Sequence, residues 1–286
     1  MITSRLSRNL LAAPGLGWIA LFLLVPCGVL FFNAFFERGI YGGIDYDART
    51  AENFTRVIDP LYLSVFLSSA RIALTATAIA IIIGYPAAFA ISLANPRRHT
   101  MLLFLVMLPF WTNYLIRTYA WMVLLNSKGL INDALIETGI IETPIPMLYS
   151  EFAVVVGLVY SYLPFVILAI YTSISRLDRS LLEASADLGA SGWRTFAKVM
   201  LPLTLPGIAT GAVFIFVLSI GNFVSADLLG GGQVQMLGNL IYDQFLTARD
   251  WPFGAALSLV LIAVMMLLLF IQATVTGRAA NKGAIT

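Results

Sequence analysis

Long runs of residues without charge limit what this chain can fold into. Five segments contain no Asp, Glu, Lys or Arg. Each has about 20 residues or more, which is the length that crosses the ~30 Å hydrocarbon core of a bilayer as a helix. The segments are Gly15–Phe36, Ile72–Ala94, Phe152–Ile174, Leu203–Ala226 and Gly254–Val275. This pattern predicts a chain that crosses a membrane several times.

A sixth apolar run, Met101–Leu125, is interrupted only by Arg117. With 59% hydrophobic and 11% charged residues, the composition is far from that of an ordinary water-soluble protein. A helix satisfies its backbone hydrogen bonds within one segment, as a bilayer requires. The sequence therefore predicts an all-α, polytopic membrane protein with six transmembrane helices in a domain over 15–276, between an N-terminal segment at 1–14 and a tail at 277–286.

Charge is distributed unequally between the two sets of loops. One set, which includes both termini, carries ten basic and three acidic residues, whereas the other carries five basic and twelve acidic residues. Loops rich in Lys and Arg stay on the cytoplasmic side. Both termini are therefore predicted to be cytoplasmic.

Several other functions lack the residues that they need. A net charge of +2 without a basic run does not indicate nucleic-acid binding. Cys27 is the single cysteine and His99 the single histidine, so the chain cannot form an intrachain disulfide or a cysteine-rich or histidine-rich metal site. An intramembrane enzyme is disfavoured for the same reason. A secondary transporter usually shows an internal repeat and intramembrane carboxylates, which the five charge-free runs lack.

The loop between the fourth and fifth runs, Ser175–Pro202, is the largest on the predicted cytoplasmic side. Apolar residues recur at helical spacing over Leu177–Leu188, and charged residues recur at every fourth position. Gly189 follows where a left-handed helix end is least costly, and Ser191 is placed to cap a second short helix that ends before Pro202. We expect two short helices that meet at a glycine and protrude from the membrane; this loop is called the elbow below.

The elbow carries a recognisable motif. Glu183-Ala184-Ser185, three residues, Gly189, nine residues, Val199, one residue and Leu201-Pro202 resembles the EAA motif of the membrane subunits of ABC importers. The sequence departs from that pattern only with Ser185 for alanine and Val199 for isoleucine. In that family the elbow docks in a cleft of the cytoplasmic ATPase; the alternative is an interfacial amphipathic helix without a partner. The resemblance implies an ATPase-coupling role for Glu183, Ala184, Ser185, Asp187, Gly189, Leu201 and Pro202.

The chain contains no G-x-x-x-x-G-K-[ST] phosphate-binding loop, so we expect no cofactor here and assign ATP and Mg²⁺ to a separate ATPase. Family resemblance implies two ATPase subunits, two permease subunits and an external solute-binding protein at a bacterial inner membrane. A distinct partner permease is expected, and a homodimer is the alternative. The implied mechanism is alternating access driven by the ATPase.

Further stretches resemble a narrower group, the permeases of the spermidine/putrescine type. They are Leu108–Trp121 and Asp227–Gly231 followed by Asp250–Leu257. Asn222 and Ala226 stand where that group has an acidic residue and a proline. The resemblance implies uptake of a polyamine, with opines, amino-acid-like solutes and ferric iron as alternatives carried by related permeases.

Candidate residues for the solute path lie mostly in the third run. Helical spacing places Phe110, Tyr114, Arg117 and Trp121 on one face, and Trp111 lies in the same stretch. Aromatic faces can hold an alkylammonium by cation–π contact, although such residues often serve packing or interface anchoring. Arg117 would repel a polyamine, so we interpret it as structural or gating, or as the partner of an acid in another subunit.

The fifth run offers two more candidates. Asp227, at its outer end, is the best-placed carboxylate for a cationic solute. Asn222, one helical turn inside it, could line the path or bond a neighbouring helix. Gly207 and Gly211 form a small-xxx-small pair, which predicts close helix packing in the chain or at a subunit interface.

Overall fold

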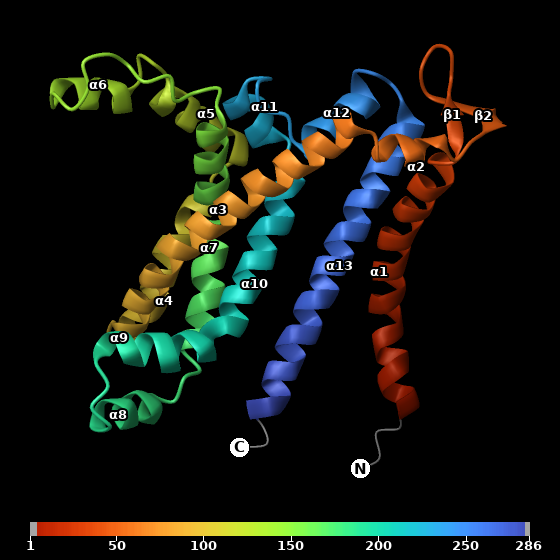
Figure 1. Cartoon of the computed structure of the whole chain (residues 1–286). Coiled ribbons are helices and arrows are strands. Elements are labelled where there is room, and N and C mark those ends of the chain that lie inside the picture. The colour runs from red at the N-terminus through yellow and green to blue at the C-terminus, as the bar shows by residue number, and fades with distance from the viewer. Residues whose placement is uncertain (1–4, 284–286) are drawn as a thin grey trace. The chain divides into compact units, whose positions relative to one another are not determined.

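The computed structural model describes residues 5–283 and, within them, the side chains of residues 13–178 and 180–274. Most of this range is helical (Figure 1). In chain order the elements are α1 (Arg5–Asn33), β1 (Phe36–Arg38), β2 (Ile44–Arg49), α2 (Glu52–Val57), α3 (Pro60–Leu93), α4 (Pro96–Met107), η1 (Leu108–Trp111), α5 (Tyr114–Leu125), α6 (Leu130–Glu137), α7 (Glu151–Ile174), α8 (Arg179–Asp187), α9 (Gly192–Thr195), η2 (Phe196–Met200), α10 (Leu201–Ile220), α11 (Val224–Gly230), α12 (Leu237–Leu246) and α13 (Trp251–Gly283).

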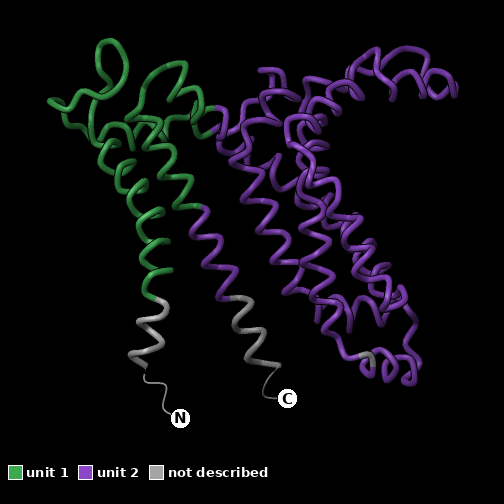
Figure 2. Tube along the Cα trace, turned by 180° about the vertical axis from the view of Figure 1, so that it is seen from behind, with its two compact units in different colours: residues 1–63, 240–264 green, residues 64–239, 265–286 purple. Residues whose placement is uncertain are grey.

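The chain divides into two compact units, coloured separately in Figure 2. Unit 1 comprises residues 1–63 and 240–264, and unit 2 comprises residues 64–239 and 265–286. Within the described range, five helices are long and apolar enough to cross a membrane, and a bent helix pair gives a sixth span if it crosses as one. The prediction of an all-α polytopic membrane protein is confirmed.

The third predicted span is broken. Instead of one helix over Met101–Leu125, α4 and η1 end at Trp111 and α5 begins at Tyr114; the segments Pro96–Trp111 and Tyr114–Glu137 are bent by 85° relative to each other. Pro109 lies in the 3₁₀ turn η1 that directly follows α4, and its missing N–H removes a helical hydrogen bond there, which favours the end of the helix. Thr112 is extended, and the side chain of Asn113 caps α5 by accepting from Leu115 N at 2.8 Å. Polar and proline residues inside an apolar run therefore divide it.

The fifth predicted span, Leu203–Ala226, ends earlier than expected. Helix α10 ends at Ile220, and a new helix, α11, begins at Val224. Asn222 lies in the break, not in a helix as predicted, and its Oδ1 accepts from the Ser225 N–H at 2.8 Å. A glycine followed by an asparagine that bonds a nearby backbone N–H competes with the helical ladder.

Other spans extend beyond the charge-free runs that predicted them. Helix α3 begins at Pro60, not at Ile72, and Asp59 Oδ1 accepts from Leu61 N at 2.9 Å near its start. Helix α13 begins at Trp251, where Asp250 Oδ1 accepts from Phe253 N at 3.2 Å. Each of these helices therefore begins near the residue whose side chain caps it, several residues before the charge-free run starts.

Unit 1 contains a two-stranded hairpin fixed to the end of α1. Strands β1 and β2 are antiparallel, with Arg38 opposite Ile44. The buried side chain of Asn53, on α2, donates through Nδ2 to the carbonyl oxygens of Ala34 at 3.0 Å and Phe36 at 2.8 Å. These bonds hold α2 against the segment that joins α1 to the hairpin.

A charged contact ties α2 to the start of α13 in the same unit. Both Nη atoms of Arg56 lie 3.1 Å from Asp250 Oδ2, and the Arg56 guanidinium lies 4.0 Å from the Phe253 ring centroid. Asp250 is buried, so this pair is shielded from water more than a surface ion pair would be.

Unit 2 is organised around α7, which packs against α4, α5, α10 and α11. Its most apolar face carries Leu158, Val166 and Ile170, all fully buried. The predicted glycine pair lies in this packing: Gly207 faces α7 at Ala169 and Ser173, so the pair mediates a contact within the chain.

Candidate functional site

The first helix of the elbow, α8, is built as the sequence pattern predicts. Asp178 stands at its N-cap and accepts from the Ser180 N–H at 2.9 Å. This hydrogen bond to the carboxylate lowers the pKa of Asp178 below its usual value. The cap is therefore fully formed near neutral pH and is lost only as the pH falls through that lowered pKa.

The predicted glycine stop is confirmed. Gly189 has φ of +76°, the left-handed conformation that only glycine adopts without cost. Around it the N–H of Gly189 donates to Ala186 O at 2.9 Å and that of Ala190 to Ser185 O at 3.1 Å, which ends α8. Ser191 does occupy the N-cap position of α9, but its side chain makes no capping hydrogen bond there.

A hydroxyl pair links the two elbow helices. Ser185 Oγ, on α8, lies 2.8 Å from Thr195 Oγ1, on α9, and Ser185 is buried. The sequence identifies Ser185 only as a departure from the EAA pattern and does not predict this hydrogen bond. An alanine could not form this link, so the departure stiffens the elbow of this particular chain.

The second elbow helix does not end before Pro202. Residues Gly192–Ile220 form one continuous helix of 29 residues, because α9, the π-helical turn η2 and α10 follow without a break. Pro202 lies inside this helix, directly after the π-helical turn η2, and a local π adjustment of this kind lets a helix accommodate the missing N–H of a proline. The elbow therefore continues directly into a membrane span.

Two contacts hold the continuous helix Gly192–Ile220 against α3. The Tyr85 hydroxyl lies 3.0 Å from Thr204 Oγ1, and the Tyr85 ring meets the Phe196 ring edge-on at 5.4 Å between centroids. Both contacts are in unit 2 and lie at the junction of elbow and span.

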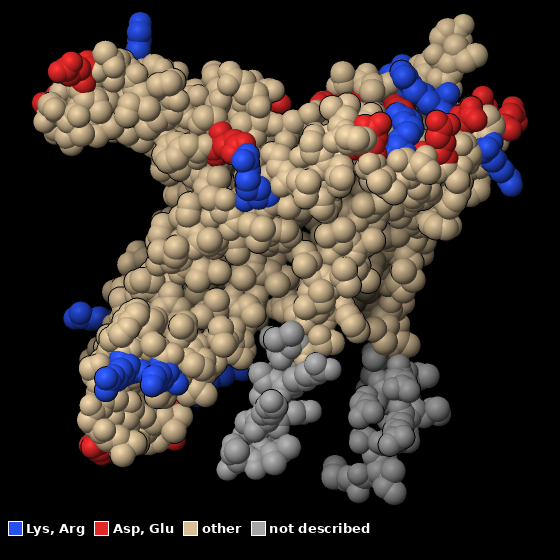
Figure 3. Space-filling view, viewed as in Figure 1, with Lys and Arg blue, Asp and Glu red and all other residues tan. Residues whose placement is uncertain are grey.

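The rest of the elbow surface is exposed to solvent and carries both charged and apolar side chains. Glu183, Ala184 and Asp187 are exposed on α8, and no hydrogen bond or ion pair is made by the two carboxylates among the described side chains. Two large apolar side chains are also unusually open, with Leu188 88% and Trp193 73% exposed. Figure 3 shows basic residues gathered over α9 and acidic residues at α8. Such a surface suits a protein partner.

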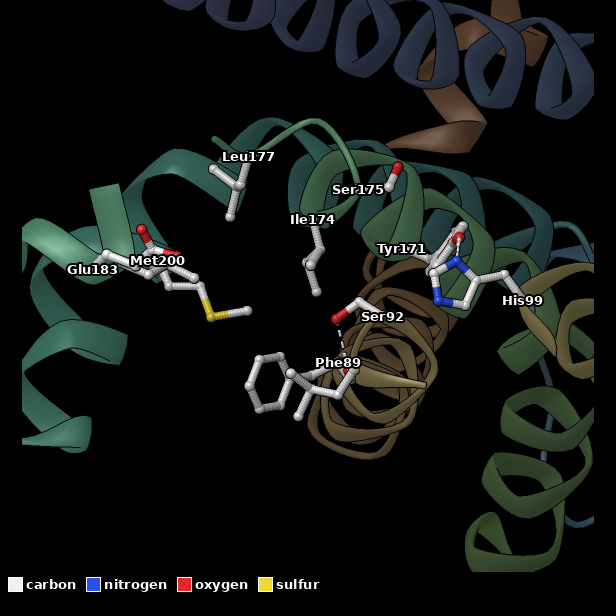
Figure 4. Close-up of a pocket in the computed structure, with 11 residues that line it drawn as sticks. Phe89, Ser92, His99, Tyr171, Ile174, Ser175, Leu177, Glu183 and Met200 are labelled. Atoms are coloured by element: carbon white, nitrogen blue, oxygen red, sulfur yellow. Dashed lines mark hydrogen bonds between the residues drawn. The ribbon is translucent and has the colours of Figure 1, made fainter. Parts of the chain in front are cut away.

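A cavity of about 370 Å³ lies between the elbow and the ends of α3 and α7 (Figure 4). Its lining includes Phe89, Ile174, Leu177, Glu183 and Met200. Protein interiors are normally packed without such spaces. Along this cavity the elbow is therefore not closely packed against these two helix ends.

His99 lines one side of this cavity and is half-buried. Its Nδ1 lies 3.0 Å from the Tyr171 hydroxyl and its Nε2 lies 2.9 Å from Ala94 O. It thereby joins the start of α4 to the end of α7.

A second group of polar residues gathers at the two broken spans. Asn222 Nδ2 donates to the hydroxyls of Tyr114 and Tyr162, both at 2.8 Å. The Tyr114 hydroxyl also lies 2.7 Å from Ser225 Oγ. This set, Tyr114, Tyr162, Asn222 and Ser225, is called the tyrosine cluster. It joins α5, α7 and the α10–α11 break.

Of this cluster, the sequence predicted Tyr114 and Asn222 but not Tyr162 or Ser225. Tyr162 could have been noticed as a hydroxyl within a charge-free run. Nothing local indicated its register toward Asn222, because that depends on how α7 and α10 pack.

Arg117 lies one turn beyond Tyr114 on α5. Its side chain is 8% exposed, its Nε has no hydrogen-bond partner, and no acid pairs with it in the described part of the chain. The guanidinium lies 5.4 Å from the Phe110 ring centroid and 5.6 Å from that of Tyr114. Phe110 belongs to η1, not to the same helix as Tyr114, so the predicted single face is in fact assembled across the break.

The remaining candidates lie apart from the cluster. Trp111 is exposed and meets Phe104, and Trp121 packs edge-on against Tyr160. Asp227 is exposed on the first turn of α11. The structure therefore brings together Tyr114, Arg117 and Asn222. Trp111, Trp121 and Asp227 lie outside the contacts that these residues make.

Replacing Asn222 by alanine is expected to lower the free energy of unfolding by about 1–3 kcal/mol, because two tyrosine hydroxyls and one backbone N–H lose their partner. The midpoint of thermal unfolding in detergent measures this loss. In Asn222→Asp the hydroxyls can donate to the carboxylate, so this variant should lose much less. Equal midpoints for Asn222→Ala and wild type would contradict a stabilising cluster.

Comparison with known proteins identifies the family of this chain. Residues 80–280 match the family described as binding-protein-dependent transport system inner membrane component. The chain belongs to this family. The permease is 45% identical over 256 residues to the spermidine/putrescine transport system permease protein PotB of Haemophilus influenzae, covering 89% of this chain and 88% of the relative. It is 42% identical over 255 residues to PotB of Escherichia coli, covering 89% and 92%.

Solved structures agree with the fold of the permease. A crystal structure of a bacterial alginate ABC transporter in complex with an alginate pentasaccharide-bound periplasmic protein aligns over 96% of each chain, with a TM-score of 0.71 and 17% identity. At that identity the likeness concerns the fold alone. The family match, and not this likeness, identifies the permease as an inner-membrane component of a binding-protein-dependent transport system.

Proposed function

We propose that the permease forms, together with a second permease subunit, the membrane path of an ATP-driven importer of polyamines such as spermidine and putrescine. The observation that carries the substrate class is the 45% identity to a spermidine/putrescine permease over 89% of the chain. The motif spacing in the elbow supports the ATP-driven mechanism independently of that relative.

We place both termini and the elbow in the cytoplasm, on the basis of the excess of Lys and Arg in these segments. Two separate ATPase subunits then bind ATP and Mg²⁺ and receive one elbow from each permease subunit. A related but distinct second permease and an external solute-binding protein complete the complex. The short loop at residues 95–100 then lies on the cytoplasmic side as well, and the β1–β2 hairpin faces outward.

The elbow couples the ATPase to the path. Exposed Glu183 and the open side chains of Leu188 and Trp193 suit a docking surface, and the continuous helix Gly192–Ile220 carries movement of that surface into a span. The cavity behind Glu183 and Met200 gives the elbow space to move. A packed helix pair with two arrangements is a common device for such switching.

The solute path is proposed to pass the two broken spans. Backbone that is not helical at membrane depth is tolerated only where protein covers it or where it lines a wet cavity. The tyrosine cluster lies at these breaks and offers hydroxyl and amide oxygens, which accept hydrogen bonds from an ammonium group. Asp227, exposed on α11, supplies a carboxylate at the outer end.

A second candidate substrate class is an amino-acid-like solute. It is favoured by Arg117, whose buried Nε lacks a partner beside the tyrosine cluster and could pair with a carboxylate of the solute. An opine also carries carboxylates, so the same observation applies to it, whereas ferric iron has no comparable observation in its favour.

The test is uptake of labelled spermidine and putrescine into vesicles that hold the complete complex with its binding protein. We expect ATP-dependent uptake of at least one polyamine, and no uptake without ATP. Unlabelled amino acids are added as competitors. Uptake of neither polyamine would overturn the substrate class, and competition by amino acids would favour the second candidate.

A further inference from the structure

Two large apolar side chains stand almost entirely in solvent at the tip of the β1–β2 hairpin. Ile40 is 94% exposed and Tyr41 is 92% exposed, the highest values for any large hydrophobic residue whose side chain the structure describes. They do not belong to the apolar surface of a span. An isoleucine and a tyrosine that pack against nothing in their own chain are costly to leave in water unless a partner covers them.

The tip is held in one shape despite its exposure. Within it, the Gly42 N–H donates to Gly39 O at 2.8 Å, and the Gly43 N–H donates to Arg249 O at 2.7 Å. Gly42 and Gly43 have φ of +86° and +82°, which only glycine adopts readily. A Cβ on Gly42 would lie 2.7 Å from the Cβ of Arg249, so the tip is in close contact with the segment before α13.

Arg249 itself has φ of +51°, an uncommon conformation for a residue other than glycine. Such local strain persists only where the surroundings hold it, and it is concentrated at functional positions. The buried Asp250 that follows is fixed by Arg56. The exposed tip is therefore supported by an ordered base, and little conformational entropy would be lost when it binds a partner.

The hairpin stem argues against the lipid bilayer as that partner. Glu37, Arg38, Asp47 and Arg49 are charged and exposed on the two strands below the tip. In Figure 1 the tip points away from α1 and from the start of α13 in the same unit, and Figure 3 shows acidic and basic side chains gathered at its base. A tip that extends beyond a charged stem projects into water, where a protein can reach it.

We propose that Ile40 and Tyr41 are the anchor through which the permease binds its external solute-binding protein. This proposal rests on the orientation given under the proposed function, because the hairpin follows α1 and so faces outward when the N-terminus is cytoplasmic. The cytoplasmic ATPase cannot reach it there. Exposed aromatic and large aliphatic residues on a rigid support are typical of the few contacts that dominate protein binding.

The test uses the complete complex in lipid nanodiscs and the solute-loaded binding protein. The variant Ile40→Ser with Tyr41→Ser is compared with wild type for the Kd of the binding protein and for ATPase activity with and without it. We expect the Kd to rise at least tenfold and the stimulation of the ATPase to be lost, while basal ATPase activity is unchanged. Ile140→Ser, which removes an isoleucine 70% exposed in another loop, is the matched control and should behave as wild type.

Photo-crosslinking tests the same contact without the double variant, so its result does not depend on whether that variant folds. Benzoylphenylalanine incorporated at position 40 should crosslink to the binding protein, and at position 140 it should not. An unchanged Kd with no crosslink at position 40 would overturn the anchor, and a crosslink to the second permease instead would assign the tip to the subunit interface. If wild type itself neither bound the binding protein nor transported solute, the proposed function would fail first.

Discussion

Replacing Glu183 by lysine is expected to reduce ATP-dependent uptake at least a hundredfold while the permease still inserts and folds. Glu183 is exposed on α8 and forms no ion pair with another described residue of the chain, so its replacement removes no internal contact. A reversed charge at a docked surface costs several kcal/mol, and about 1.4 kcal/mol corresponds to a tenfold change in affinity. The measurements are vesicle uptake and co-purification of the ATPase.

Two controls separate docking from folding. Glu183→Gln keeps the shape of the side chain and should fall between wild type and Glu183→Lys. Glu142→Lys makes the same charge change in a loop on the other side and should leave ATPase co-purification unchanged. Thermal midpoints of all variants should agree within the small range expected for surface substitutions. Normal ATPase association and uptake in Glu183→Lys would show that the motif glutamate has no coupling role.

Gly207→Ala is expected to destabilise the permease by about 1–3 kcal/mol, because it separates two helices that pack tightly. A Cβ at Gly207 would lie 2.4 Å from Ser173 Cβ and 2.8 Å from Ala169 O. The second of these atoms is backbone and cannot rotate away, so α7 and α10 must move apart. The gain of up to about 1 kcal/mol from replacing glycine in a helix offsets only part of this cost.

Gly211→Ala, one turn along the same helix, is the matched comparison. There the new Cβ would lie 3.4 Å from Val166 Cα, an ordinary contact, so the variant should be neutral or slightly stabilised. The midpoint of thermal unfolding in detergent distinguishes the two, and lower uptake should accompany the lower midpoint. If both alanine variants unfolded at the same temperature as wild type, the close approach of α7 and α10 would be refuted.

The helical spans could be predicted from sequence because absence of charge over about 20 residues is a property of each segment by itself. The breaks were missed because hydropathy averages over a window. Pro109 and Asn113 in one apolar run, and Gly221 with Asn222 in another, carried local signals for a helix end that the apolar average concealed.

Contacts between elements were beyond the reach of the sequence for a different reason. The elbow could be predicted because its spacing is local, and Gly189 does adopt the left-handed conformation. The bond of Ser185 to Thr195 and the meeting of Tyr162 with Asn222 depend on how helices rotate against each other. The ion pair of Arg56 and Asp250 joins residues that are far apart in the sequence, and no local pattern specifies it.

The unbroken helix Gly192–Ile220 joins the second part of the elbow to a membrane span as one rigid segment. Its 29 residues would extend about 43 Å at a rise of 1.5 Å per residue. A tilt of about 5° at the elbow would displace the far end by roughly 4 Å over that length. Asn222 lies just beyond this end, and its bonds to Tyr114 and Tyr162 are 2.8 Å long. Under the coupling role proposed for the elbow, a small rotation there would be enough to break these hydrogen bonds of the tyrosine cluster at the far end of the helix.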